Sequence, residues 1–244
     1  MSKDRMLLAV LIDADNIPAK YAADIMKEVT TFGVPALRRV YGDWSSGGLA
    51  TWKKTVAELG MVAEQQTANT TGKNATDIGL VIDAMDILHT GRFDGFVLVS
   101  SDSDFTALAN RLREDGVEVI GIGESKAPVS LRNVCNRFIL IENIIAASDE
   151  NDDAKAKETK KPAKDQASRQ PPSKAVPNVL KAMKSMDPEL EWYSLGALGQ
   201  HIQRAYPDFD PRTYGVSKLS DLLEKTGQFE LRKEGGHFEV RRKT

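Results

Sequence analysis

The stretch Phe96–Phe105, FVLVSSDSDF, places two aspartates, Asp102 and Asp104, shortly after an apolar run. Four large apolar residues in a row are typical of a strand that is buried on both faces of a parallel sheet. In parallel α/β proteins, ligands usually bind at the carboxyl ends of the strands. The two aspartates are therefore predicted to lie where a ligand would bind.

Short apolar runs of this kind alternate with helical patterns through the first part of the chain. Strands are expected at residues 7–12, 37–41, 61–64, 96–100, 117–122 and 138–141, and helices at 19–31, 49–59, 76–89 and 105–114. Strands separated by helices of this length favour a parallel sheet with helices on both faces. The sequence therefore predicts a three-layer α/β/α fold with a mostly parallel sheet.

A segment rich in charge and proline, residues 148–173, follows this block. It has almost no large apolar residue and cannot bury a core, so it is interpreted as a disordered linker between a first domain, 1–147, and a second, 174–244. The second domain shows helical patterns at 175–186, 195–205 and 216–226, and two alternating strands about a Gly-Gly turn. Three helices and a hairpin predict a small winged helix-turn-helix domain.

The overall composition limits the class of protein. A chain of 244 residues with 41% hydrophobic residues can form real cores, and its one cysteine, Cys135, excludes an intrachain disulfide and a four-thiolate zinc site. We expect a reducing, cytoplasmic setting. The apolar run Met6–Ile12 is too short to span a membrane, so no membrane partner is expected.

The net charge of −2 argues by itself against a nucleic-acid partner, because phosphate binding favours a basic surface. The charge is split by region, however. Acids exceed bases before residue 148, and bases exceed acids after residue 174. A basic second domain is compatible with RNA binding.

Acids also occur at two other places that the fold would bring close to Asp102 and Asp104. The motif VLIDADN, residues 10–16, ends the first strand with Asp13, and Asp15 and Asn16 follow in the loop. Asp77 would lie in the first turn of the helix 76–89, which Thr76 could cap. Because parallel strands end at one edge of the sheet, these acids are expected to converge if the first and fourth strands are neighbours.

The orientation of the helix 76–89 follows from its apolar spacing. Residues Ile78, Val81, Ile82 and Met85 are expected to form the buried stripe. Asp77 would then lie at the edge of this stripe, and Asp83 and Asp86 would be solvated.

Several carboxylates in one pocket repel one another unless some are protonated or a cation lies between them. An all-oxygen ligand set favours Mg²⁺ or Mn²⁺, which leave coordination positions open for a substrate phosphate. The pattern therefore favours hydrolysis of a phosphodiester. The alternative is that each aspartate only caps a helix, as Asp102 could cap the helix that follows Phe105.

The motifs VLIDADN, TGKNATDIGLVIDA (residues 71–84) and LVSSDSDF (residues 98–105) together resemble the NYN domain, a LabA-like branch of the PIN-like metal-dependent ribonucleases. The resemblance covers roughly residues 5–145 and implies a PIN-like fold. It also implies that Asp13, Asp77, Asp102 and Asp104 are catalytic and bind the metal. Asn16 and Lys73 match polar residues of the family's motifs and are candidates for binding substrate.

The second domain, through YGVSKLSDLL (residues 214–223) above all, resembles the OST-HTH or LOTUS domain, which is associated with RNA. The resemblance implies an RNA partner. Trp44, in a loop with glycine and serine, could stack on an unpaired base. Basic residues of the hairpin and tail could contact phosphates, namely Arg232, Lys233, Arg241, Arg242 and Lys243.

The leading hypothesis is thus a Mg²⁺- or Mn²⁺-dependent ribonuclease with a C-terminal RNA-binding module. A non-catalytic RNA-binding or regulatory adaptor is the alternative from another class. The pair Asp13 and Asp15 also suggests a haloacid-dehalogenase-type phosphatase, although Asn16-Ile17-Pro18 departs from that pattern. No G-x-G-x-x-G turn follows the first strand, so a nicotinamide dinucleotide fold is disfavoured. A homodimer remains possible.

Overall fold

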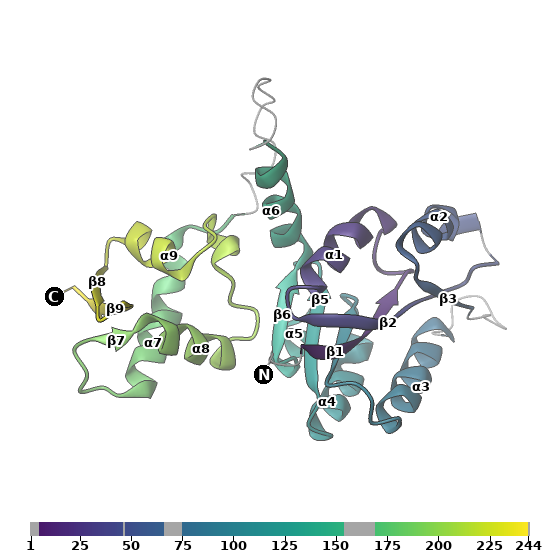
Figure 1. The fold of residues 1–244 in the computed structure, drawn as a ribbon, viewed down its shortest axis with the longest axis horizontal. Helices are drawn as coiled ribbons and strands as arrows, with labels where there is room; N and C mark the ends of the chain where they lie inside the picture. The colour runs from purple at the N-terminus through teal and green to yellow at the C-terminus, as the bar shows by residue number, and fades with distance from the viewer. Residues whose placement is uncertain (1–4, 46, 66–74, 154–168, 244) are drawn as a thin grey trace. The chain divides into compact units, whose positions relative to one another are not determined.

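A computed structural model describes residues 5–45, 47–65, 75–153 and 169–243 (Figure 1). The chain divides into two compact units, Met1–Ile145 and Ala146–Thr244. Each unit has its own hydrophobic core and is described by itself.

The first unit is built on six parallel strands. In chain order they are β1 (Met6–Asp13), β2 (Gly33–Gly42), β3 (Val62–Gln65), β4 (Gly95–Val99), β5 (Glu118–Gly123) and β6 (Arg137–Leu140). In space the order is β3-β2-β1-β4-β5-β6, so β1 and β4 are neighbours at the centre. From β1 the chain adds β2 and then β3 on one side of the sheet. It then crosses back to β4 and adds β5 and β6 on the other side. The strand order therefore reverses between β1 and β4.

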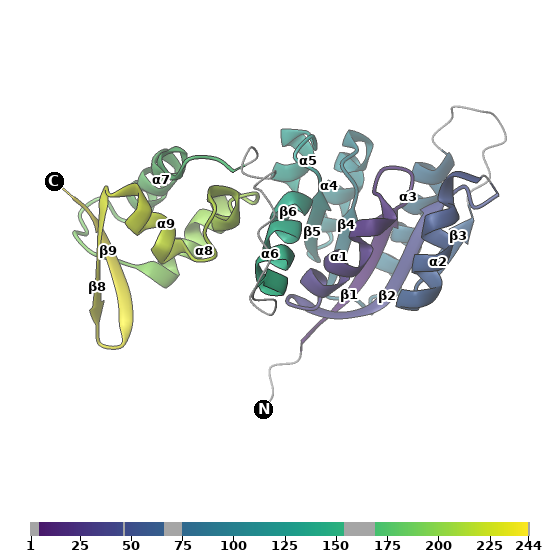
Figure 2. The same ribbon diagram turned by 90° about the horizontal axis from the view of Figure 1, so that it is seen from above.

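Helices cover both faces of this sheet, which makes the three layers predicted from the sequence (Figure 2). The helices are α1 (Ala22–Val29), α2 (Ala50–Leu59), α3 (Ala75–His89), α4 (Thr106–Glu114), α5 (Val129–Val134) and α6 (Ile141–Asp153). Figure 2 shows α1, α2 and α6 on one face and α3, α4 and α5 on the other. The 3-10 helices η1 (Ala19–Tyr21), η2 (Gly47–Leu49) and η3 (Ser103–Phe105) precede α1, α2 and α4.

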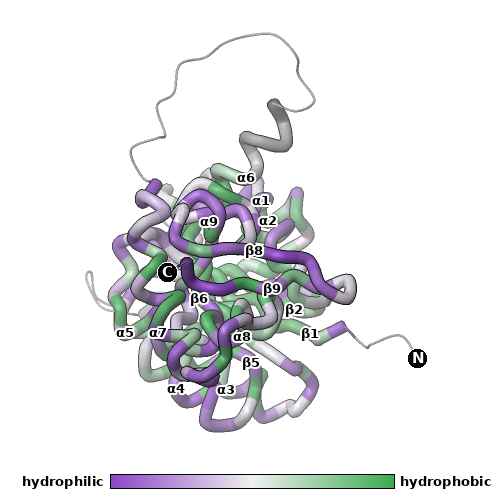
Figure 3. The backbone as a smooth tube through the Cα atoms, turned by 90° about the vertical axis from the view of Figure 1, so that its left-hand side faces the viewer, coloured by the Kyte–Doolittle hydropathy of each residue, from purple (hydrophilic) through white to green (hydrophobic). Residues whose placement is uncertain are grey.

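The alternation of side chains along β1 explains why both faces of the sheet are covered. Leu8, Val10 and Ile12 belong to the core beneath α1 and α2, whereas Ala9 and Leu11 belong to the core beneath α3 and α4. All five side chains are fully buried, as expected for a central strand of a parallel sheet. Figure 3 shows this apolar character in the sheet, in green.

The orientation of α3 differs from the prediction. Its buried side chains are Leu80, Ala84, Ile87 and Leu88, and these pack on the sheet. Ile78 and Ile82, which were expected to be buried, are 60% and 57% exposed. The predicted stripe was therefore wrong for Ile78 and Ile82, whereas Val81 and Met85 are partly buried against the core. α3 carries apolar residues on more than one side, so their spacing alone does not select the buried face.

The second unit contains a three-helix and hairpin arrangement. Its elements are η5 (Pro172–Ala175), α7 (Val176–Met186), β7 (Tyr193–Ser194), α8 (Leu195–Ala205), η6 (Pro211–Tyr214), α9 (Leu219–Thr226), β8 (Phe229–Glu234) and β9 (His237–Arg242). The strand β9 lies between β7 and β8 in an antiparallel sheet. The hairpin β8–β9 is mostly hydrophilic (Figure 3). The expected winged-helix elements are thus present.

Two helices, α5 and α6, differ from what the sequence predicts. The short helix α5 follows Pro128 and was not anticipated, because six residues are too few to show a helical period. The helix α6 continues to Asp153, into the segment interpreted as a linker. Within the residues described, none of the helices is long and apolar enough to span a membrane.

Candidate active site

The strand order reverses between β1 and β4, whose carboxyl ends lie side by side. Ile12 pairs with Val99 in the register, so both strands end at the same edge of the sheet. The chain then leaves β1 toward the face that α1 covers and leaves β4 toward the face that α4 covers (Figure 2). In open parallel sheets such a reversal point is where ligands bind. Asp13 ends β1 here, and the segment 100–104 follows β4.

The turn after β4 is organised by Asp102. This residue is the N-cap of η3, and its Oδ1 accepts a hydrogen bond from the backbone N–H of Asp104 at 2.9 Å. Asp102 was predicted to cap the helix that follows Phe105, but α4 begins with no side-chain cap hydrogen bond, and the capping role of Asp102 is on η3 instead. This role does not exclude a second one, because a capping carboxylate has two oxygens and this hydrogen bond uses Oδ1. Asp104 lies in the first turn of η3 and is exposed.

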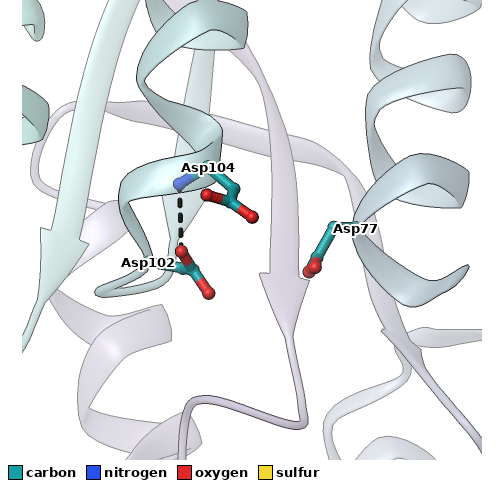
Figure 4. A group of neighbouring side chains, drawn as sticks. All are labelled: Asp77, Asp102 and Asp104. Atoms are coloured by element: carbon teal, nitrogen blue, oxygen red, sulfur yellow. Dashed lines mark hydrogen bonds between the residues drawn. The ribbon is translucent and has the colours of Figure 1, made fainter. Parts of the chain in front are cut away.

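Asp77 faces these two acids from the first turn of α3. One carboxylate oxygen from each of Asp77, Asp102 and Asp104 lies within 4.8 Å of the other two. Figure 4 shows the three side chains directed toward a common space between α3 and η3. Burial raises the pKa of Asp77 above its ordinary value, and the charges of Asp102, Asp104 and Asp15 raise it further. The three acids, which we call the acid trio, therefore repel one another electrostatically.

Asp13 lies beside the acid trio but is buried, at 2% exposure. Its Oδ2 accepts from Ser100 Oγ at 2.9 Å, and its Oδ1 accepts from the backbone N–H groups of Asp15 and Asn16 at 3.2 Å each. Burial raises the pKa of Asp13 to about 6, the Ser100 hydrogen bond opposes this shift, and the charge of Asp77 adds to it. Asp13 is therefore a tightly held acid whose pKa responds to the charge of Asp77 in the trio.

The loop after β1 connects to both segments that carry the trio. Asp15 Oδ2 accepts from Thr76 Oγ1 at 2.8 Å, next to Asp77, and Asn16 Oδ1 accepts from the backbone N–H of Ser101 at 3.2 Å, next to Asp102. Thr76 was expected to cap α3, but the helix begins at Ala75 and the Thr76 hydroxyl bonds to Asp15 instead. These contacts fix the spacing between α3 and the turn after β4.

Two positioning residues were not anticipated, namely Ser100 and Ser101. Ser100 Oγ donates to Asp13 and accepts from the backbone N–H of Asp102, while Ser101 Oγ accepts from the backbone N–H of Glu124 at 2.8 Å. The signal that could have indicated the two serines is their position directly after a buried strand. Asp13 and Glu124, the distant partners, are 87 and 23 residues away in the chain and cannot be paired from a single sequence.

Of the three predicted substrate contacts, Asn16 lies at the site. Lys73 falls outside the residues that the structure describes. Trp44 is half-buried against the core beneath α1 and α2, and its indole Nε1–H donates to the backbone oxygen of Glu64 at 2.9 Å. Its role in base stacking stays a prediction.

A second charged group anchors α3 to the sheet. Asp83 was expected to be solvated, but its carboxylate accepts from Arg39 Nη1, at 2.6 Å to Oδ2, and from the Tyr41 hydroxyl. Arg39 Nε also lies 3.3 Å from Glu64 Oε1. The pKa of Arg39 is raised, mainly by its hydrogen bond to Asp83. The prediction for Asp83 was wrong because the actual orientation of α3 turns this carboxylate toward β2, whereas Asp86 is exposed as expected.

Replacing Arg39 by methionine is expected to lower the free energy of unfolding by about 1–3 kcal/mol, because Asp83 and Glu64 lose the cation that lies between them. Arg38→Met is the matched control. Arg38 is the next residue of β2 and its side chain donates to the backbone oxygen of Leu59 instead. Urea unfolding of both variants in chelator measures the difference. Equal losses would show that the Arg39–Asp83 pair has no special role.

In the second unit, two of the five basic residues that were predicted to contact phosphates form ion pairs with acids of the same unit. The guanidinium carbons of Arg232 and Arg241 lie 4.1 and 4.6 Å from the ring centroid of Trp192. Arg232 pairs with Glu239 at 2.7 Å, and Arg241 pairs with Glu230 at 2.8 Å. These arginines stabilise the hairpin, so the expected phosphate contacts rest more on Lys233, Arg242 and Lys243.

A parallel sheet with this strand order, and carboxylates gathered at its reversal point, defines an α/β protein with an acidic site of the kind that binds divalent cations. A family model for the NYN domain matches residues 7–142, and one for the OST-HTH/LOTUS domain matches residues 171–240. The chain belongs to the NYN domain family and also carries an OST-HTH/LOTUS domain. Both resemblances predicted from the motifs are confirmed, and together the two domains support a ribonuclease-like RNA-binding protein.

Two solved structures show low similarity to the chain. One is a protein of unknown function from Vibrio parahaemolyticus, with 18% identity, a TM-score of 0.49, and coverage of 58% of this chain and 96% of that one. The other is MurG of Acinetobacter baumannii, with 8% identity, a TM-score of 0.38, and coverage of 90% and 69% respectively. None of the curated proteins matches the chain. The family assignment therefore rests on the two domain matches.

Proposed function

We propose that this protein is a ribonuclease that depends on Mg²⁺ or Mn²⁺ and hydrolyses RNA phosphodiester bonds at the acid trio. The observation that carries the proposal is the approach of Asp77, Asp102 and Asp104 within 4.8 Å, on two segments at the reversal point of the sheet. Oxygens bound to opposite sides of one Mg²⁺ are roughly 4.2 Å apart, twice the usual ligand distance. The acid trio fits a hard dication in number and chemistry, and the 4.8 Å limit on its oxygen separations is slightly larger than this spacing.

Such an ion, when bound, would stabilise negative charge on a substrate phosphate. The residues of the chain have separate tasks. Asp77, Asp102 and Asp104 hold the ion, and its charge offsets the repulsion that raises the pKa of Asp77. Asp13 is proposed as the fourth acid of the site, where it adds negative charge and orders the loop that leads to Asn16.

Substrate binding is proposed for Asn16, Lys73 and Trp44, and for the OST-HTH/LOTUS domain. That domain would retain RNA and so raise its effective concentration near the first unit. We propose the cytoplasm as the location, since a lone buried cysteine suits a reducing compartment. A homodimer is not supported by the comparisons and forms no part of the proposal.

The test is incubation of the purified full chain with end-labelled single-stranded and structured RNAs, in Mn²⁺, Mg²⁺ or chelator. We expect cleavage with the metal and none with chelator. Asp102→Asn is expected to abolish cleavage and to retain RNA binding, because it removes one anionic ligand while the remaining amide oxygen can still cap η3. This variant also controls for copurifying nucleases.

RNA binding without cleavage in any metal would overturn the proposal and favour the adaptor. Metal-dependent cleavage that is unchanged in Asp102→Asn would also overturn the assignment of the site. A phosphatase of the haloacid-dehalogenase type is disfavoured by the structure, because the carboxylate that would act as its nucleophile, Asp13, is 2% exposed and both of its oxygens accept hydrogen bonds.

A further inference from the structure

A cavity of about 370 Å³ lies between the loop after β1 and the start of α2. We propose that it binds one nucleoside of the RNA strand, next to the phosphate that the trio would hold. The inference rests on the proposed function and adds a substrate subsite to it. The volume falls within the range of roughly 300–1,000 Å³ that is usual for small-molecule sites.

Two residues form a wall that the cavity shares with the acidic site. Asp15 and Asn16 line the cavity. The same two side chains contact the segments that carry the trio, Asp15 through Thr76 and Asn16 through the backbone of Ser101. A strand whose phosphate lies at the trio would therefore have its neighbouring nucleoside at the mouth of this cavity.

The lining of the cavity is apolar at its base and polar at its rim. Ile17, Leu49 and Trp52 are at most 6% exposed, and the Trp52 Nε1–H donates to the backbone oxygen of Ile17 at 2.9 Å, which fixes the indole ring. Lys20 and Thr51 line the cavity and are exposed. A nucleoside has a matching division between a flat apolar face and polar edges.

The charge of the lining favours a nucleoside over a free anion. The carboxylate of Asp15 would repel a phosphate placed inside the cavity, but it can accept a hydrogen bond from a ribose hydroxyl or a base amino group. Lys20 could contact the backbone phosphate that remains outside. The arrangement is thus suited to hold the sugar and base and to leave the phosphates in solvent.

The test uses the full chain labelled with ¹⁵N, in chelator, titrated with adenosine and uridine 5′-monophosphates as probes. We expect both nucleotides to shift the amide signals of Asn16, Gly48 and Thr51. Thr51→Trp, which fills the rim, is expected to remove these shifts. Thr55→Trp is the matched control, because Thr55 lies one turn further along α2 and does not line the cavity.

A second pair of variants gives an independent measurement. Lys20→Glu is expected to raise the KM for short single-stranded RNA about tenfold, a typical effect of losing one nucleotide's contacts, while Lys27→Glu changes it less than about twofold. Lys27 is exposed on α1 and lies outside the cavity. Both variants replace a lysine by a glutamate, so they have the same net charge.

The two proposals fail in different ways. Nucleotide shifts at Asn16 and Thr51 that Thr51→Trp removes would support the subsite, even if no metal produced cleavage. Metal-dependent cleavage with no shifts at these amides would overturn the subsite and leave the ribonuclease proposal intact. Equal effects of Thr51→Trp and Thr55→Trp would also overturn the subsite.

Discussion

Replacing Asp77 by asparagine is expected to lower the rate of Mn²⁺-dependent RNA cleavage at least about 100-fold, the scale of loss expected when a positioned charge at a reacting centre is removed. Asp77 is the only member of the acid trio on α3, so the substitution leaves the ion with carboxylates from one segment alone. RNA affinity is expected to change little, because the OST-HTH/LOTUS domain is untouched. Single-turnover cleavage and equilibrium RNA binding measure the two quantities separately.

Asp86→Asn is the matched control for this prediction. Asp86 lies on the same helix and is exposed. Thermal unfolding gives a readout that does not depend on activity. Mn²⁺ is expected to raise the melting temperature of the wild type and of Asp86→Asn, because an ion that binds only the folded state stabilises it, and to raise that of Asp77→Asn much less. An undiminished metal response in Asp77→Asn would show that the ion binds elsewhere.

The closeness of Asp13 to the turn that carries Asp102 could be predicted because it follows from topology. Asp13 ends one apolar run and Asp102 follows another after two serines, and neighbouring parallel strands must end at the same edge of the sheet. A capping role for Asp102 could be predicted from local sequence, since the hydrogen bond joins residues two positions apart, although the helix that it caps is η3 and not α4. Local patterns and a general rule of parallel sheets were sufficient for this part of the site.

The orientation of α3 could not be obtained in this way. The stripe of Leu80, Ala84, Ile87 and Leu88 has the same helical spacing as the stripe that was predicted, so the period fits both faces. What distinguishes them is tertiary, namely the pairing of Asp83 with Arg39 and Tyr41 on β2. Those partners are 44 and 42 residues away. The link from Asp15 to Thr76 spans 61 residues and was missed for the same reason.

Asp13 provides a case in which the requirements of the site and of the fold conflict. Its pKa is raised to about 6 by burial, from an ordinary value of 3.8. Below about pH 4, the carboxyl is protonated in both the folded and unfolded states. As the pH rises from about 4 to 6, the unfolded chain releases the proton while the folded protein retains it, so stability falls. Above about pH 6 the folded protein carries a buried charge at a cost of about 2–3 kcal/mol.

Asp13→Asn is therefore expected to raise the free energy of unfolding of the metal-free protein by about 2–3 kcal/mol at about pH 8, with little change at about pH 4. The asparagine Oδ1 can still accept from the N–H groups of Asp15 and Asn16. Its Nδ2 can donate to Ser100 Oγ, which reverses the hydrogen bond that Ser100 donates to Asp13. Urea unfolding in chelator at the two pH values measures the effect.

The same substitution is expected to lower Mn²⁺-dependent cleavage, because it removes the proposed fourth acid of the site, on which the charge of Asp77 acts. A variant that is more stable and less active would indicate that the buried charge is retained for the chemistry of the site and not for the fold. The control variant Asp86→Asn, which replaces an exposed acid, should change neither the free energy of unfolding nor the rate of cleavage at either pH. If Asp13→Asn were instead less stable than the wild type at about pH 8, the Asp13 carboxylate would have to be a stabilising part of the fold.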